Sequence, residues 1–503
     1  METLSLLGAG FISLLEPMNA AMLVLGLVLG MLVAVLPGLT LMMGVVLALP
    51  FTYSLSVTPA IILLTAMYAS GTYGGAFTSI LFRIPGEPMD VPLLWDGFAM
   101  ARQGEAAKAL GWTLVAALFG GLISAKVMVF LSNPVAKFAL TFSAPEYIPH
   151  VILGMPPVVS LAGSSVVNAL ISLFIGLFIA TVGTDSIYGI DRFSFGVPML
   201  ADGIEYLLIM VGAYGLGEIF VRMEQGFSSP VSQTVASIRT RFPRLREILS
   251  LKATLVRGTT LGTIIGIIPG AGATVSSFVA YGVEGQYGAR RKDLGKGIPE
   301  GVVAPQSAAT ASVGGAMVPL ICMGIPGSGA TAIILGAFLL HGLQPGPQVF
   351  HSSSHIVYSI FASLFASIIG MCLIGYFAIR PLVKVLDLPE ALISSFVVLF
   401  CFIGAFAARN NLSDLYLLVG FGVVGYLFEK FRFPIAPLVL GSILGPLAES
   451  SYMTTMISYR NDWTVLFTRP ISGVLMMLSV IALAFPIYRH LRDRSRASRS
   501  ATP

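Results

Sequence analysis

The chain has 503 residues, of which 56% are hydrophobic and 11% are charged, and its mean hydropathy is +0.88. Soluble proteins carry about 25% charged residues, so this composition excludes a soluble globular protein and indicates one that spans a membrane. The formal net charge of +5 needs no nucleic-acid partner, because many basic residues gather beside apolar runs, as they do in cytoplasmic loops of membrane proteins.

Apolar runs follow one another along almost the whole chain. Some have a length near the roughly 20 residues that a helix needs to cross a bilayer. Others are shorter and fit either short spans or re-entrant hairpins. We therefore predict an all-α polytopic membrane protein with roughly 10–14 membrane segments. The longer runs are 18–36, 59–83, 108–131, 164–182, 200–220, 301–323, 355–379, 391–408, 412–428 and 470–488. The shorter ones are 39–50, 146–161, 259–268, 271–282, 328–341 and 433–447.

A Pro-Gly pair interrupts an apolar run at four points, two in each half of the chain. Proline removes a backbone donor and glycine leaves the backbone uncovered, so each pair should end or break a helix. Broken membrane helices are tolerated only where they are buried in protein or line a watery cavity. Matched breaks in two halves point to a transporter's substrate site. The pairs are Pro37-Gly38, Pro85-Gly86, Pro269-Gly270 and Pro326-Gly327.

Charge divides the chain into two membrane halves. Residues 1–221 form the first half and residues 258–488 the second, and each contains two of the breaks. The stretch 222–257 between them is polar and basic, which predicts a cytoplasmic linker. The Arg/Ser-rich end, residues 489–503, is predicted to be a basic cytoplasmic tail.

The basic loops predict that the two halves are inverted repeats. In the first half the loop after the first break, 51–58, is uncharged, and the loop after the second, 99–108, is basic. In the second half the order is reversed: loop 287–296 is basic, and loop 341–348 has no Lys or Arg. By the positive-inside rule, 99–108 and 287–296 are cytoplasmic, whereas 51–58 and 341–348 face outward. Inverted repeats of this kind are a common transporter architecture.

The breaks also carry groups that suit an anion. Hydroxyls beside freed backbone N–H groups favour a carboxylate, whereas freed carbonyls can hold a small cation. The alternative is that the glycines only permit close helix packing. The predicted substrate-binding residues are Gly38, Leu39, Thr40, Ser79, Gly86, Gly270, Gly272, Thr274, Gln306, Thr310, Gly327 and Ser328.

The remaining ionisable and sulfur-containing residues have structural interpretations. Glu218 precedes Arg222 by four residues, which predicts an i,i+4 ion pair. The histidines show no spacing that would hold a metal, so no metal site is predicted. Each cysteine lies in an apolar run and is expected to pack there: Cys322, Cys372 and Cys401.

The order of several motifs resembles the large membrane subunit of the tripartite tricarboxylate transporters, over nearly the whole chain. The resemblance implies two partners, a periplasmic solute-binding protein and a small membrane subunit. It also implies uptake of a small carboxylate across the bacterial inner membrane, coupled to a gradient of Na+ or H+, with no cofactor. The motifs include Pro37-Gly38-Leu39-Thr40, Tyr73-Gly74-Gly75, Asp96-Gly97, Gly295-Lys296-Gly297, Glu300-Gly301-Val302 and Gly324-Ile325-Pro326-Gly327-Ser328.

The chain leaves the family's pattern after Pro305. Members usually have an acidic residue there, followed by paired asparagines, whereas this chain reads Gln306-Ser307-Ala308-Ala309-Thr310. An amide, a methyl group and a hydroxyl therefore replace a carboxylate and two amides. If those positions line the family's site, this protein has altered chemistry for substrate or coupling ion.

The sequence favours a secondary transporter subunit in a multi-pass inner-membrane protein. The chain contains no ATP-binding Gly-x-x-x-x-Gly-Lys-Ser/Thr motif. It also lacks His-Glu-x-x-His, Gly-x-Ser-x-Gly and paired carboxylates at catalytic spacing, so an intramembrane enzyme is not expected. The alternatives are a channel, whose flux would not be coupled, and a scaffold, which would tolerate mutation of the breaks.

Overall fold

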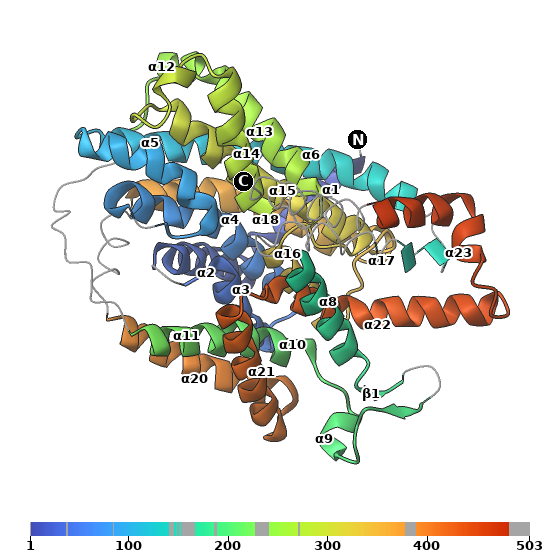
Figure 1. Cartoon of the computed structure of the whole chain (residues 1–503). Helices are drawn as coiled ribbons and strands as arrows, with labels where there is room; N and C mark the ends of the chain where they lie inside the picture. The colour runs from blue at the N-terminus through green and yellow to red at the C-terminus, as the bar shows by residue number, and fades with distance from the viewer. Residues whose placement is uncertain are drawn as a thin grey trace, which may run out of the picture. The chain divides into compact units, whose positions relative to one another are not determined.

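The computed structural model describes residues 2–36, 39–83, 85–139, 145–146, 148–149, 152, 166–185, 189–226, 241–269, 272–377 and 389–481. Nearly every element among them is a helix, which confirms the predicted all-α class (Figure 1). The chain forms two compact units that are each discontinuous in sequence: unit 1 contains 1–137 and 225–408, and unit 2 contains 138–224 and 409–503.

Unit 1 contains the four predicted breaks. Its first segment comprises α1 (Glu2–Ser13), α2 (Pro17–Val35), α3 (Leu41–Ala48), η1 (Leu49–Ser54), α4 (Val57–Phe82), η2 (Pro88–Asp90), α5 (Val91–Arg102) and α6 (Ala106–Ala139). Its second segment comprises α12 (Leu245–Ser250), α13 (Lys252–Ile267), α14 (Gly272–Tyr287), η4 (Arg291–Asp293), α15 (Glu300–Met323), α16 (Gly329–Leu340), α17 (Val349–Ser352), α18 (Ser354–Phe377) and α20 (Glu390–Arg409).

Unit 2 has helices and one small hairpin. The helices are α8 (Val166–Ala180), α9 (Pro198–Ala201), α10 (Tyr206–Met210), η3 (Val211–Leu216), α11 (Gly217–Gln225), α21 (Ser413–Lys430), α22 (Ile435–Ser458) and α23 (Val465–Thr468). The hairpin pairs β1 (Gly183–Thr184) antiparallel with β2 (Asp191–Arg192). On α11, Arg222 Nη2 lies 2.9 Å from Glu218 Oε1, so the predicted ion pair is confirmed.

Six described helices are long and apolar enough to span a membrane, which supports a multi-pass membrane protein. They are 17–35, 57–82, 106–138, 206–225, 300–323 and 354–377. Several of the shorter apolar pieces correspond to half-length helices rather than to full spans. α3, α14 and α16 have 8, 16 and 12 residues, and each begins just after a predicted break.

Each Pro-Gly pair falls between two helices, as the sequence predicts. α2 ends at Val35 and α13 at Ile267, each directly before a break. α4 ends at Phe82, and Arg83 then adopts a left-handed conformation with φ 58°. α15 ends with Gly324 at φ 71°, a conformation that glycine adopts without strain. Gly38 and Gly270, two of the predicted site residues, lie outside the described residues.

The two halves of unit 1 repeat the same helix packing. A Cβ on Gly26 of α2 would lie 2.5 Å from the Leu63 oxygen of α4, and one on Gly258 of α13 would lie 2.7 Å from the Ala304 oxygen of α15. One turn further along, Gly30 meets Met67 and Gly262 meets Ala308 in the same way. The spacing is constant: 232 residues between glycines (26 to 258, 30 to 262) and 241 between their partners (63 to 304, 67 to 308). Pairs α2–α4 and α13–α15 are therefore structural copies.

The loops that were predicted to share the cytoplasmic side are in contact. Gln103, after α5, donates from Nε2 to the Lys296 carbonyl oxygen at 2.8 Å. Gly297 also lies against the backbone of Ala99 and Met100. Their contact agrees with an inverted repeat, and which face of the membrane they occupy stays a prediction.

Candidate functional site

The start of α3 is held by two side chains. Thr40 caps the helix, because its hydroxyl accepts a hydrogen bond from the Met43 N–H at 3.2 Å. The Leu41 N–H, which has no partner within the helix, donates to the carboxylate of Glu87. Glu87 is 6% exposed and follows the second break, so it joins the two breaks of the first copy.

The start of α16 is closed by a reciprocal hydroxyl cap. Ser328 Oγ accepts from the Thr331 N–H at 3.2 Å, and Thr331 Oγ1 accepts from the Ser328 N–H at 2.7 Å. Tyr68 of α4 reaches the same cap, with its Oη 3.0 Å from Ser328 Oγ. A residue from the first copy thus contacts a break of the second.

The half-helices meet at their starts. Gly272, the first residue of α14, has φ +59°, and a Cβ there would lie 3.2 Å from the Cβ of Ser328. A Cβ on Gly329 of α16 would lie 2.3 Å from the sulfur of Met42 in α3. Thr274, in the first turn of α14, is half-buried. We call the residues that these contacts join the break cluster: Thr40, Leu41, Met42, Tyr68, Glu87, Gly272, Ser328 and Gly329. Leu39, which directly precedes Thr40, is buried.

Gly86 and Gly327 occupy equivalent packing positions beside the break cluster. A Cβ on Gly86 would lie 2.4 Å from the Ala34 oxygen and 2.4 Å from the Gly75 Cα. A Cβ on Gly327 would lie 2.8 Å from the Gly266 oxygen and 2.6 Å from the Ala316 Cα. Both glycines therefore permit close helix approach, and their contact with substrate stays a prediction.

Gln306 and Thr310 lie together in α15, where the chain departs from the family's pattern. The Gln306 amide donates to the Thr72 carbonyl of α4 and to Thr310 Oγ1, both at 3.1 Å. Gln306 is 1% exposed, and its Oε1 has no hydrogen-bond partner among the described residues. Ser79 is buried in the last turn of α4. The structure thus joins two of these three predicted site residues directly.

Sequence reasoning missed Tyr68, Glu87 and a second buried carboxylate, Asp90. Asp90 is 1% exposed, and its Oδ2 accepts from the Glu87 N–H at 2.9 Å. Within the described part of the chain, no Lys, Arg or His forms an ion pair with either carboxylate. An acidic residue directly after Pro85-Gly86 was the available signal, because uncompensated carboxylates at membrane depth are costly and usually functional. Tyr68 offered no such signal within an apolar run.

Within the described ranges, no group of three His, Cys, Asp or Glu side chains could hold a metal ion. The three cysteines are buried and free, as expected.

A family model described as the tripartite tricarboxylate transporter TctA family matches residues 20–440. The chain belongs to the TctA family.

Two relatives come from Agrobacterium vitis. This TctA-family chain is 34% identical over 497 residues to an uncharacterized 52.8 kDa protein in the TAR-I ttuC' 3' region, covering 98% of this chain and 99% of that protein. It is 33% identical over 233 residues to an uncharacterized protein in the TAR-II ttuC' 3' region, covering 46% of this chain and 96% of that protein. No solved structure matches the chain significantly.

Proposed function

We propose that this TctA-family chain is the membrane subunit through which a small carboxylate is taken up across the bacterial inner membrane, driven by a gradient of Na+ or H+. A periplasmic solute-binding protein would deliver the substrate, and a small membrane subunit would complete the complex. The proposal rests on the break cluster, where three half-helices begin beside one another in buried protein. Helix N-termini and hydroxyls at such a point favour a carboxylate over a neutral or cationic ligand.

The transport mechanism follows from the two copies. Each copy supplies a broken helix to the same cluster, so small movements of the copies could expose the cluster to one side of the membrane and then to the other. Thr40 and Ser328 would present hydroxyls to the substrate, and Gly272 would present backbone. The wall formed by α4 and α15, with Tyr68 and Gln306, would exclude water.

Reconstitution tests the proposal. The chain is incorporated into proteoliposomes with its small membrane subunit, the binding protein is added outside, and uptake of labelled citrate is measured as a probe tricarboxylate. We expect saturable uptake that requires the binding protein and an imposed Na+ or H+ gradient. Flux that does not saturate and ignores both gradients would indicate a channel. Uptake that persists without this chain would reduce it to a scaffold.

A further inference from the structure

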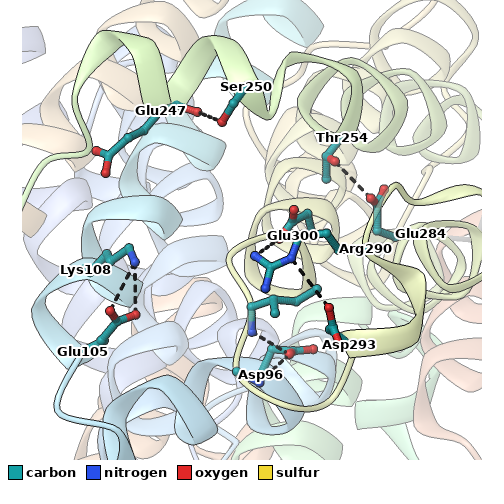
Figure 2. Close-up of polar contacts among 12 residues, drawn as sticks. Asp96, Glu105, Lys108, Glu247, Ser250, Thr254, Glu284, Arg290, Asp293 and Glu300 are labelled. Carbon is teal, nitrogen blue, oxygen red and sulfur yellow. Dashed lines mark hydrogen bonds and ion pairs between the residues drawn. The ribbon is translucent and has the colours of Figure 1, made fainter.

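Asp96 of α5 is a fully buried carboxylate that binds the loop between α14 and α15. Its Oδ1 accepts from the N–H groups of Gly297 and Ile298, each at 2.9 Å. Its Oδ2 accepts from the Gly295 N–H at 2.8 Å and from the Tyr281 hydroxyl at 2.9 Å. The side chain is 0% exposed, and Figure 2 shows it beside the loop that carries Asp293.

The loop is shaped to receive this one carboxylate. Gly295 and Gly297 have φ of +85° and +92°, which lets N–H groups near them converge on one point. A Cβ on Gly301 would lie 2.0 Å from Asp96 Oδ2, so α15 also approaches too closely for a side chain. Arg290 pairs with Asp293 and with Glu300, which ties the loop to the start of α15 (Figure 2).

More contacts join the same elements nearer the break cluster. Ser277 of α14 donates from Oγ to the Met89 carbonyl of η2 at 2.6 Å, although the residues are 188 positions apart. Trp95 of α5 packs on the Tyr281 ring of α14, with centroids 4.7 Å apart. Thus η2 and α5 of the first copy are fastened to α14 and the loop 288–299 of the second copy along their length.

In the part of the chain that the structure describes, the equivalent pair of elements in the repeat has no carboxylate at the position of Asp96. Because α2 and α4 match α13 and α15, the order of elements makes α16 the counterpart of α5. The junction between η1 and α4 is likewise the counterpart of the loop 288–299. α16 contains no ionisable residue, and the junction is only Leu55-Ser56. α16 meets α3 through Met42 and Gly329, a contact between apolar groups. One pair of half-helices is therefore held by hydrogen bonds to a buried carboxylate, whereas α16 has no ionisable side chain that could make such bonds.

We propose that η2, α5, α14 and the loop 288–299 move as one rigid body during transport, with Asp96 as the positioning residue that holds this body together. We call Asp96 and the four groups that donate to it the clamp: the N–H groups of Gly295, Gly297 and Ile298 and the Tyr281 hydroxyl. Opening the clamp would leave a carboxylate and four donors without partners in a buried site, which costs far more free energy than sliding one apolar surface over another. Gly272 belongs to this body and Glu87 directly precedes η2, whereas Thr40 and Ser328 are the N-caps of α3 and α16. The break cluster therefore lies at the edge of this body, where the hydrogen bond from the Leu41 N–H to Glu87 joins the body to α3. This inference rests on the proposed function.

A cross-link tests whether the clamp stays closed. Gln103→Cys and Lys296→Cys are combined after Cys322, Cys372 and Cys401 are replaced by alanine, and a disulfide or short linker joins the pair. Citrate uptake in the reconstituted complex should stay within about twofold of the reduced protein. Loss of uptake on cross-linking, with recovery on reduction, would show that α5 and the loop separate in each cycle and would overturn the proposal.

Amide hydrogen exchange tests the role of Asp96 without any transport. In the intact complex Asp96→Asn should speed exchange in the segment 295–298 by roughly tenfold or more, because an amide offers one acceptor oxygen where the carboxylate offers two. Lys292→Gln, at an exposed position of the same loop, should leave that segment unchanged. If Asp96→Asn does not assemble, Tyr281→Phe removes one of the four bonds and should give a smaller increase. Unchanged exchange in both Asp96→Asn and Tyr281→Phe would refute the clamp.

The two experiments separate this inference from the proposed function. One outcome is that the reduced double-cysteine protein takes up no citrate while Asp96 still protects the amides of the segment 295–298 from hydrogen exchange. In that case the proposed citrate transport is wrong and the proposed role of Asp96 is supported. If uptake is intact but cross-linking stops it, the rigid body fails and the transporter assignment stands.

Discussion

Tyr68 and Ser328 share a hydrogen bond of 3.0 Å although they are 260 positions apart, and each belongs to a different copy of the repeat. Tyr68 is 2% exposed, so the phenol lies within protein. Ser328 also exchanges hydrogen bonds with Thr331, which means that the cap of α16 does not depend on Tyr68 for its own stability. Tyr68 can therefore be substituted to test the role of the break cluster without disrupting a helix.

Replacing Tyr68 with phenylalanine should lower citrate uptake without lowering the amount of protein in the membrane. A net hydrogen bond contributes about 0.5–1.5 kcal/mol, which corresponds to roughly a 2- to 10-fold change in rate or affinity. Tyr416→Phe is the matched control, because Tyr416 is 78% exposed in unit 2. Equal uptake by both variants would remove Tyr68 from the site.

Replacing Gly86 or Gly327 with alanine should destabilise the protein rather than only weaken binding. A methyl group at either position meets backbone atoms within 3 Å, and overpacking of this kind typically costs about 1–3 kcal/mol. We expect a lower melting temperature in detergent for both variants. Gly282→Ala is the control, since a Cβ there meets nothing within 4 Å. A normal melting temperature with lost uptake would instead favour direct contact with substrate.

Replacing Gln306 with glutamate should make transport depend on pH or sodium in a new way. The amide donates to the Thr72 carbonyl, and a carboxyl group can do so only when protonated. The variant should therefore be more stable and more active at low pH and lose both as pH rises, unless a cation takes the proton's place. Adding Ala309→Asn and Thr310→Asn should shift the dependence further. An unchanged ion and substrate profile in a well-expressed triple variant would exclude this stretch from the site.

Replacing Glu87 with glutamine should separate its charge from its hydrogen bond. Glutamine retains an oxygen that can accept from the Leu41 N–H, so α3 should keep its start and the protein its stability. If the buried charge acts in ion coupling, gradient-driven accumulation should fall at least several-fold while exchange of internal for external citrate persists. Glu105→Gln, at an exposed ion pair, is the control. Loss of exchange as well would assign Glu87 to substrate binding.

Cysteine labelling should establish the orientation of the copies. In a background without Cys322, Cys372 and Cys401, cysteines at Ser54 and Gln344 should label from outside intact cells. Cysteines at Gln103 and Gly288 should label only after permeabilisation, because the basic loops that contain them are predicted to be cytoplasmic. Labelling of Gln103 and Gln344 from the same side would contradict the inverted repeat.

The sequence by itself determined the membrane class, the family and the positions of the helix breaks. Composition and local chemistry decide these features: apolar runs in lipid satisfy their backbone groups as helices, and adjacent proline and glycine favour a helix end. The pair Glu218–Arg222 was predictable for the same reason, since i,i+4 geometry is local.

Only the tertiary structure decided which breaks meet and which side chains join them. Glu87 reaches Leu41 across 46 positions, and Asp96 reaches Gly297 across 201, because helix packing brings these segments together. The constant spacing of glycine contacts in α2–α4 and α13–α15 likewise needs three dimensions, since each contact joins two different helices. Long-range contacts depend on how helices pack, and the apolar periodicity of a membrane helix does not encode its partner.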